Sequence, residues 1–236
     1  KSYHTPHQAR DPFFCAMPDR LLMYYIHYEN PHDIEHGWPP ERTVETKVTY
    51  TDDGETWSAP QRVHERGANF WRPKMRDGRI YVGGLYTEAA EFGGAVLPSM
   101  GVYDLAVAAY APDGGHLWSN GFGGEGISQG LHLDVEGDGV YFTGRFKDDL
   151  NLGVEYLVAT PGDYDVFVAR FDPDDGSPVW AKSIGGPGED QANGIAVGSD
   201  GSVFVAGHSE GDVPFAGSTT APPGGWLEGF VLGISQ

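Results

Sequence analysis

The sequence is poor in cysteine, in basic residues and in long apolar runs. Cys15 is the only cysteine among 236 residues, so no disulfide can form within the chain. We interpret its thiol as a small buried apolar group. Fifteen Lys and Arg stand against 34 Asp and Glu, which gives a formal net charge of −19. Nucleic acids and anionic membranes bind basic surfaces, so neither is expected as a partner. No apolar run approaches the ~20 residues that a membrane helix needs.

Helical periodicity is scarce as well. Short alternating or β-branched runs recur instead, separated by Gly, Asp and Pro, which is typical of an all-β domain with many short strands. The 35 Gly and 17 Pro indicate many turns, and the 13% aromatic content argues against disorder. The runs predicted as strands are 21–28, 44–50, 79–85, 105–110, 140–145, 166–171, 202–207 and 229–234.

An acidic turn followed by a tryptophan recurs at a nearly fixed interval. Its three copies end at Trp57, Trp118 and Trp180, which are 61 and 62 residues apart. A constant period predicts repeated supersecondary units. We expect four units, at approximately 10–66, 67–126, 127–189 and 190–236, with residues 2–8 added to the last. The repeated tryptophans are expected to pack between neighbouring units.

Each complete unit is expected to hold four antiparallel strands. Such sheets repeated around an axis are the blades of a β-propeller. The prediction is one propeller domain over residues 1–236, with four four-stranded blades of about 60 residues. The fourth unit stops after its third strand, and residues 2–8 are expected to close the ring as its outer strand. Alternatively, a second chain meets the open edge, in a homodimer that shares one ring.

Turns and connections follow the same period. The Asp-Gly pairs at 77–78, 138–139 and 200–201 predict tight hairpins between the first two strands of a unit. Four long connections, at 29–43, 87–102, 147–163 and 209–227, occupy the same place in the repeat. Insertions at one equivalent position mark the binding face of a repeat protein. This face and the nearby beginnings of the first strands are therefore where we expect a ligand.

Two groups of motifs resemble known families. Arg10-Asp11-Pro12, the Asp-box-like Asp52-Asp53-Gly54-Glu55-Thr56-Trp57 and Phe70-Trp71-Arg72-Pro73 resemble bacterial sialidase-like propellers. Asp165-Val166-Phe167-Val168-Ala169-Arg170-Phe171, Gly185-Gly186-Pro187-Gly188-Glu189-Asp190 and Asp200-Gly201-Ser202-Val203-Phe204-Val205-Ala206-Gly207 resemble the bacterial propeller repeat of the SBBP type. The resemblances imply a propeller fold. Their presence in one chain implies a natural mosaic or an engineered chimera.

The sialidase-like resemblance implies a candidate site. It implies that Arg10 clamps a substrate carboxylate, for which the planar guanidinium is suited, and that Asp11 is the catalytic acid/base. Arg72 lies at the equivalent first-strand position of the second unit and is a candidate second clamp. Trp71 and Tyr86 lie near the same face and complete the substrate-binding candidates. A general glycosidase would instead need two carboxylates across a pocket, for example Asp11 with Asp33, Glu35 or Glu45.

No metal or other cofactor is expected. His32-Asp33-Ile34-Glu35-His36 brings metal-capable side chains together, but zinc needs three or four rigidly held ligands, and we interpret the segment as a solvated loop. The acidic turns around Asp52 and Asp172 lack the spacing and the terminal Glu of a calcium-binding EF-hand loop. Their Asp side chains are expected to cap their own turns.

The function expected from these observations is a secreted, glycan-directed propeller, extracellular or periplasmic in a bacterium. It would bind a sugar or another small molecule in a central funnel. Hydrolysis of that sugar would make it a sialidase-like glycoside hydrolase, and whether it is an enzyme stays open. The alternative is a non-catalytic structural or interaction scaffold. Because the chain opens at Lys1 without Met, a signal peptide is expected to have been removed or not included.

Overall fold

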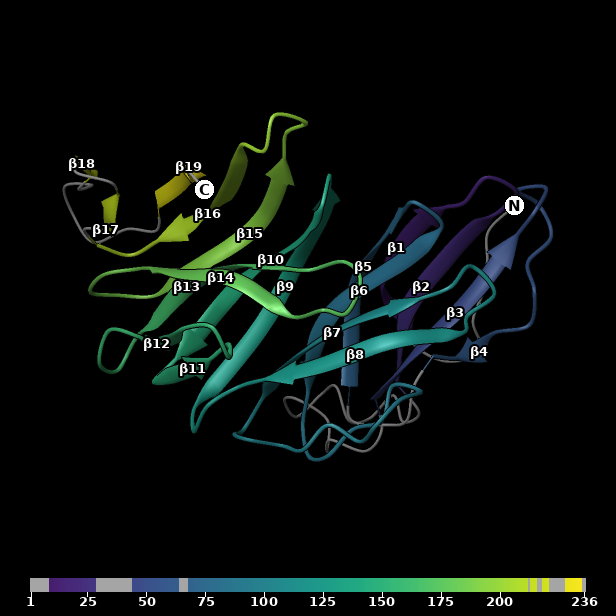
Figure 1. The fold of residues 1–236 in the computed structure, drawn as a ribbon, viewed down its shortest axis with the longest axis horizontal. Coiled ribbons are helices and arrows are strands. Elements are labelled where there is room, and N and C mark those ends of the chain that lie inside the picture. The colour runs from purple at the N-terminus through teal and green to yellow at the C-terminus, as the bar shows by residue number, and fades with distance from the viewer. Residues whose placement is uncertain are drawn as a thin grey trace.

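The computed structural model describes residues 9–28, 44–63, 68–211, 213–215, 218–220 and 228–234. Every regular element within these ranges is a β-strand, so the part of the chain that is described is all-β (Figure 1). The expected strand at 2–8 and the long connection at 29–43 lie outside the described residues.

Four antiparallel sheets follow one another along the chain. The first sheet contains β1 (Ala9–Ala16), β2 (Leu21–Tyr28), β3 (Val44–Thr51) and β4 (Gln61–Arg62). The second contains β5 (Ala68–Arg76), β6 (Arg79–Tyr86), β7 (Asp104–Tyr110) and β8 (His116–Phe122). The third contains β9 (Ile127–Glu136), β10 (Gly139–Lys147), β13 (Tyr164–Phe171) and β14 (Pro178–Ile184). The fourth has three strands in the order β15 (Asp190–Val197), β16 (Val203–Ser209) and β19 (Glu228–Ile234).

Two small hairpins lie in the long connections. β11 (Asp149–Asn151) pairs with β12 (Tyr156–Val158), and β17 (Val213–Phe215) pairs with β18 (Ser218–Thr220). In the third sheet, Lys147 at the end of β10 lies opposite both Ile127 and Tyr164. The first strand therefore begins at the end of the sheet from which the long connection leaves. This confirms the expected proximity of these two features within a sheet.

All eight strands predicted from the sequence are present, with ends within two residues of the prediction. The reason is that alternating and β-branched runs fit a pleated, half-buried surface, which each of these sheets provides. The first sheet departs from the predicted pattern, because β4 has only two residues and Trp57 precedes it outside any strand. Trp118 and Trp180, by contrast, lie on the fourth strands β8 and β14.

The predicted Asp-Gly hairpins form with different turns. Asp77 and Gly78 have φ of +48° and +72°, as a two-residue primed turn requires. In the third sheet the positive φ belongs to Gly137, one residue before Asp138, so the turn is shifted along the chain. In the fourth sheet the N–H of Gly198 donates to the Ser202 carbonyl, which makes the connection longer than a two-residue turn.

The acidic turns cap themselves, as predicted. Asp53 Oδ1 accepts the backbone N–H groups of Glu55 and Thr56, both at 2.7 Å, and these bonds lower the pKa of Asp53 to about 2. Asp172 Oδ1 accepts the N–H of Asp174 at 2.8 Å. Bonds of this kind stabilise the anionic carboxylate and the turn together.

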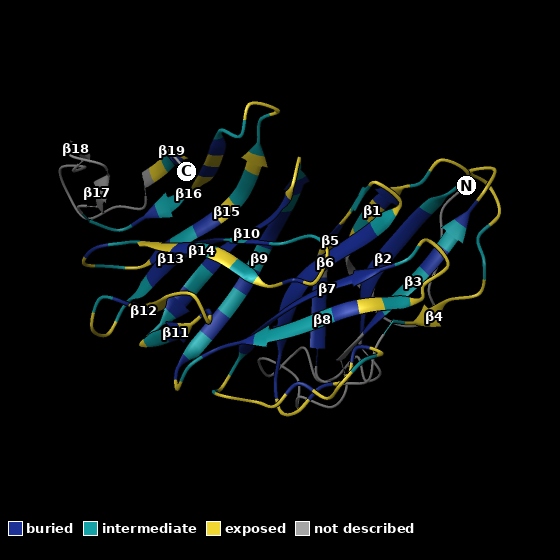
Figure 2. Ribbon diagram, in the orientation of Figure 1, coloured by how far each residue is buried: buried dark blue, intermediate teal, exposed yellow. Residues whose placement is uncertain are grey.

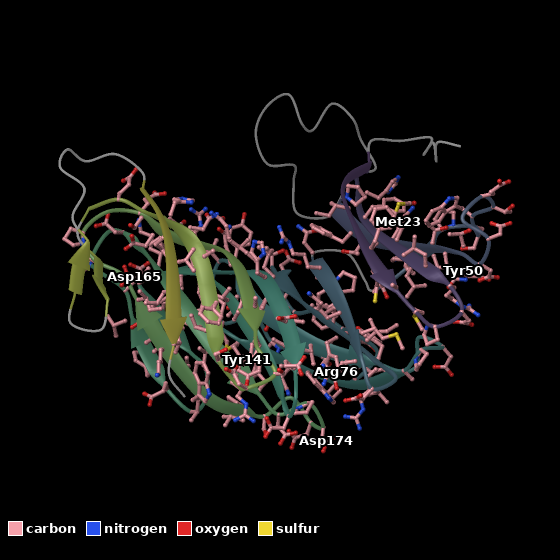
Figure 3. All side chains as sticks on the ribbon, turned by 90° about the horizontal axis from the view of Figure 1, so that it is seen from above. Met23, Tyr50, Arg76, Tyr141, Asp165 and Asp174 are labelled. Atoms are coloured by element: carbon pink, nitrogen blue, oxygen red, sulfur yellow. The ribbon has the colours of Figure 1, made fainter. Side chains whose placement is uncertain are left out.

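Three apolar clusters hold the sheets together in a row. One joins the first and second sheets, another the second and third, and a further one the third and fourth. Figures 1 and 3 show the same order from two directions, with the first and fourth sheets at opposite ends of the row. Met23 and Tyr50 mark the first sheet in Figure 3, and Asp165 lies toward the other end.

Candidate functional site

The first strands of the four sheets form a continuous inner row. β1 contacts β5, β5 contacts β9, and β9 contacts β15. Each of these strands also breaks its register with the second strand of its sheet. The breaks fall between Arg10 and Phe13, between Trp71 and Lys74, opposite Thr143 and Gly144, and between Ala192 and Gly194. Register breaks bend a strand and redirect side chains, and they are common next to binding sites.

Arg72 lies within the break of β5 in a strained conformation. Its φ is +49°, a value that costs a residue other than glycine about 1–2 kcal/mol. Its side chain is exposed, and its guanidinium carbon lies 5.7 Å from the centre of the Phe13 ring on β1. Partial burial lowers the pKa of Arg72 from its usual value, although the group stays charged. The break therefore presents a fixed positive charge beside an aromatic ring.

His132 lies at the break of the next inner strand, β9. Its side chain is buried, and burial together with the charge of Arg72 lowers its pKa to about 4. The imidazole is therefore neutral near pH 7, with one ring nitrogen as a donor and the other as an acceptor. Phe13, Arg72 and His132 thus bring an aromatic face, a cation and a neutral imidazole together from three sheets.

Ion pairs fix the spacing between β5 and β9 farther along the row. Lys74 lies 3.2 Å from Asp134, and Arg76 forms a bidentate pair with Glu136 at 2.6 and 3.1 Å. Asp134 also accepts the N–H of Val197 on β15 at 3.0 Å, so one carboxylate joins three inner strands. These contacts hold the row rigidly, which a preformed site requires.

The third sheet carries a second cation at the end where the long connections leave. Arg145 on β10 donates to Gln129 Oε1 at 2.8 Å and lies 3.6 Å from Glu189. Its guanidinium carbon is 4.3 Å from the centre of the Tyr164 ring. Arg145 is therefore fully engaged by neighbours, unlike the exposed Arg72.

The break of β15 is occupied by a short polar network. Asn193 is the extra residue, and its amide lies 2.8 Å from His208 Nδ1. Gln191 Nε2 donates to Asn193 Oδ1 at 2.6 Å. Polar side chains thus occur at the breaks of the last three inner strands, although the residue types differ from sheet to sheet.

Four of the five predicted site residues fall on the inner strands β1 and β5, whereas Tyr86 is on β6. Arg10 of β1 lies opposite Ile26 of β2, and Asp11 is in the adjoining break. Trp71 of β5 lies opposite Gly83 of β6. The structure describes the backbone of Arg10, Asp11 and Trp71 but not their side chains. β1 and β5 contact each other, so the backbone positions of the two predicted arginines belong to neighbouring strands.

Tyr86 has a different place from the one expected. It is 0% exposed, and its hydroxyl donates to the Pro98 carbonyl at 2.9 Å. Burial raises its pKa well above the ordinary value. The side chain packs edge-on against Phe92 in the core between the first and second sheets. The expectation that Tyr86 contacts a ligand is therefore corrected, because its polar atom is already satisfied inside the protein.

Sequence reasoning missed Phe13 and His132. The repeat contained a signal for His132, because it follows Gly130 by two residues just as Arg72 follows Phe70. Gly130 and Phe70 lie opposite Gly144 and Gly84, at the same register position of their sheets. Aligning the units residue by residue would have placed the imidazole beside the arginine. No comparable signal distinguishes Phe13 from other strand aromatics.

Within the described residues, no group of three or more His, Cys, Asp and Glu side chains is arranged to hold a metal ion. The segment 32–36 lies outside those residues. A search of the described part for a helix long and apolar enough to span a membrane finds none.

Comparisons with known proteins find similarity over part of the chain or at low sequence identity. No family model matches the chain. Over 134 residues the chain is 33% identical to the regulatory protein FlaEY of Caulobacter vibrioides, covering 55% of this chain but only 14% of that relative. A xylan β-1,4-xylosidase from Bacillus halodurans C-125 has a TM-score of 0.45 at 15% identity, over 94% of this chain and 43% of the xylosidase. A glycosyl hydrolase from Bacteroides ovatus has a TM-score of 0.25 at 12% identity, over 95% and 84% of the two chains.

Proposed function

We propose that the chain is a glycan-directed β-propeller module that binds an acidic sugar at the inner row. In this proposal the four sheets are blades, and β1, β5, β9 and β15 are the strands nearest the axis. The antiparallel order within each sheet and the contacts between successive first strands support that arrangement. The net charge of −19 fits a secreted protein, extracellular or periplasmic.

The observation that carries the proposal is the conformation of Arg72. A strained backbone persists where the surroundings hold it, and it is concentrated at binding sites. Here the strain directs a guanidinium toward the Phe13 ring while leaving it exposed. A guanidinium binds a carboxylate through two parallel hydrogen bonds, and an aromatic ring packs on the apolar face of a sugar. The neutral His132 adds a hydrogen-bonding partner that does not repel the arginine.

Arg10, Asp11 and Trp71 extend this site in the proposal. Arg10 and Asp11 occupy the neighbouring inner strand at its own register break, and Trp71 directly precedes Arg72. Arg10 would be the second clamp on a carboxylate, Trp71 would pack on the sugar ring, and Asp11 would be the acid/base of a hydrolytic reaction.

Binding of sialylated and neutral oligosaccharides, measured by calorimetry, tests the site. Arg72→Ala should weaken binding of a sialylated oligosaccharide by about 10–100-fold, because a charge-assisted hydrogen bond contributes about 1.5–3 kcal/mol. Arg72→Lys keeps the charge but loses the planar guanidinium that donates two parallel hydrogen bonds, so only part of the affinity should be recovered. Arg62→Ala, on the exposed strand β4, is the matched control and should leave affinity within about twofold. Equal affinity of the wild type and Arg72→Ala would refute the proposal.

Turnover of a fluorogenic sialoside and a panel of aryl glycosides tests hydrolysis separately. Loss of turnover in Asp11→Asn, with binding retained, is the result expected of an enzyme. Binding without turnover in the wild type would identify a lectin instead.

A second candidate is a non-catalytic interaction module. It is favoured by an exposed apolar face on the fourth sheet, which a glycan-binding function does not use. The partial relative is itself described as a regulatory protein. Absence of both glycan binding and turnover, together with association through that face, would favour this candidate.

A further inference from the structure

At two junctions of the row, one face of a sheet is buried by the sheet that follows it. Tyr81 and Val107 of the second sheet are 2% and 0% exposed in the cluster shared with the third sheet. Tyr141 and Val168 of the third sheet are 2% and 0% exposed in the cluster shared with the fourth. By the pairing registers Tyr141 is the equivalent of Tyr81, and Val168 is the equivalent of Val107. We call the side of a sheet that carries these positions its onward face.

The fourth sheet carries its onward face uncovered. Val203 of β16 is buried in the cluster with the third sheet, so the adjacent Phe204 lies on the opposite, onward face. Phe204 takes the register position of Tyr141, and Val231 on β19 takes that of Val168. Phe204 is nevertheless 47% exposed, and Val231 is 77% exposed. Figure 2 shows exposed segments on β15 and β19, whereas β6 and β7 are dark blue.

This face is apolar across all three strands. Phe204 lies between Ala196 on β15 and Gly233 on β19, and Val231 lies opposite Ala206 on β16. All five residues are exposed. None of them is charged, although the chain has 15 Lys and Arg and 34 Asp and Glu. A contiguous exposed apolar patch marks an interaction surface.

The two halves of the patch differ in relief. A Cβ atom added to Gly233 on β19 would lie 3.6 Å from the Phe204 ring, so the ring extends from β16 beside β19, where Val231 also projects. A Cβ atom added to Gly194 on β15 would meet no atom within 4 Å. The face thus has a raised half over β16 and β19 and a low half over β15. Two such faces fit together when the raised half of one lies over the low half of the other.

A second copy of the chain can offer this same face but no other sheet face in the described residues. The faces that meet at the three junctions are buried in the apolar clusters. The remaining side of the first sheet carries Met23, Tyr25 and Thr49, which are 7%, 3% and 1% exposed, so the chain itself already covers it. A contact between the sheets of two copies is therefore a contact of like with like.

We propose that the fourth sheets of two copies pack face to face through their onward faces, related by a twofold axis that runs along the strands. Such an axis places β16 over β16 of the partner and β19 over β15 of the partner, which brings each raised half over a low half. Sheets packed face to face lie ~10 Å apart with interdigitating side chains. The contact would cover the positions that a following sheet covers at the two preceding junctions, and an isologous pair of this kind is closed.

Net charge and size set the conditions for measuring this association. Two copies with a formal charge of −19 each repel one another, and an uncharged face lets them touch without bringing carboxylates together. The strands of the fourth sheet have seven or eight residues, so the face measures roughly 15 by 25 Å. This is smaller than the ~800 Å² per partner of a standard interface, so we expect a dissociation constant in the micromolar range. Sedimentation velocity should show dimers that strengthen between roughly 50 and 500 mM salt, the opposite of a contact made by ion pairs.

Val231→Asp tests whether this face makes the contact. The change places a charge beneath the partner sheet at two symmetry-related positions, and it should weaken association at least tenfold. Val158→Asp is the matched control. It changes a side chain that is 65% exposed on the separate hairpin strand β12, and it should leave the dimer unchanged.

Position 206 tests the twofold axis, because β16 lies against its own equivalent in the proposed dimer. Ala206→Asp and Ala206→Lys would each bring like charges together, and each should weaken association at least tenfold. An equimolar mixture pairs opposite charges and should associate at least tenfold more tightly than either variant alone. A short bismaleimide should also join two Ala206→Cys copies. It should not join the wild type, whose only cysteine is 3% exposed.

The alternatives give distinct results. A monomer at every concentration and salt would overturn the proposal. A dimer insensitive to Val231→Asp would do so too, because β19 is an edge strand among the described residues and an edge-to-edge contact leaves this side chain exposed. A mixture no tighter than its components would contradict the twofold arrangement. Circular dichroism of each variant, compared with the wild type, shows that the fold is retained. Glycan binding at Arg72 plays no part in these readouts, so the two proposals fail independently.

Discussion

The junction between the second and third sheets differs from the junction between the third and fourth in how its polar groups are satisfied. Trp118 Nε1 donates to the Pro173 carbonyl at 3.0 Å, while Arg79 lies 2.7 Å from Asp174 and Asn120 donates to the Asp175 carbonyl. These three contacts attach β6 and β8 to the acidic turn of the next sheet. Trp180 is the equivalent of Trp118, but within the described residues its buried Nε1 has no partner.

The two junctions also differ in the polar residue near the start of their first strands, which is Ser128 in the third sheet and Asp190 in the fourth. Ser128 of the third sheet and Asp190 of the fourth are equivalent, since Ser128 lies opposite Phe146 and Asp190 opposite Ser209. Ser128 faces a junction with one buried carboxyl, Asp104, whereas Asp190 shares its junction with Asp165. One repeat thus carries different polar groups at equivalent positions, while an apolar cluster is present at each junction.

The largest effect is expected at Asp190. Burial, followed by the nearby Asp165 and Asp163, raises its pKa to about 7, although it accepts a hydrogen bond from the Gly186 N–H at 2.9 Å. Between pH ~4 and 7 the folded carboxyl holds a proton that the unfolded chain has lost, so stability falls as pH rises through this window. Asp190→Asn should therefore stabilise the protein at pH 8 by on the order of 2 kcal/mol, or roughly 5 °C in Tm, and change little at pH 4.

Calorimetry of the two proteins across this pH range checks the prediction. Asp200→Asn is the control, because the pKa of Asp200 is lowered by its bonds to Ser202 and its loss should destabilise slightly at neutral pH. A Tm for Asp190→Asn that is equal to or below the wild type at pH 8 would show that the carboxyl is not held protonated.

The tryptophans give the next effect. Trp118→Phe removes the bond from the indole N–H, although the Pro173 carbonyl keeps its bond from Arg79 at 2.9 Å, and this loss should cost about 1–2 kcal/mol. Trp180→Phe removes an N–H that has no described partner, so its cost should be smaller by about 1 kcal/mol. Urea denaturation of the two variants measures the difference. Equal losses would show that the indole bond at Trp118 does not stabilise its junction.

The smallest effect is expected for Arg79→Ala. Its partner Asp174 is largely exposed, and exposed ion pairs contribute ~0–1 kcal/mol. The loss should shrink in 0.5 M salt, since screening weakens the pair. A loss above about 2 kcal/mol, unaffected by salt, would instead assign the contribution to the bond between Arg79 and the Pro173 carbonyl.

The sequence predicted the strands well because their residues follow local rules. The alternation in 44–50 and the apolar, β-branched and aromatic run in 166–171 indicate strands without reference to neighbours. The register breaks could not be predicted, because a break is a property of two paired strands. Pro12 and Pro73 lie within the breaks of β1 and β5, but β9 and β15 break without a proline. The period predicted related units, but it did not reveal that β4 has only two residues.

The candidate site was predicted in part for the same reason. Arg72 was singled out by a motif, and its neighbour Phe13 by none, because their contact joins residues almost sixty positions apart. Tyr86 shows the opposite error. Its place near the predicted loop face suggested a ligand contact, but the connection that follows β6 folds back and supplies the Pro98 carbonyl to the Tyr86 hydroxyl. Which polar atoms remain available to a ligand is decided by such distant partners.

The single buried thiol of Cys15 can report on the opening of the first sheet. The side chain is 3% exposed, and burial raises its pKa to about 11. Thiol reagents attack the thiolate, so the native chain is shielded from them both sterically and chemically. Because the sequence has no other cysteine, the rate of labelling with such a reagent would measure how often β1 detaches from the second sheet, without any engineered probe.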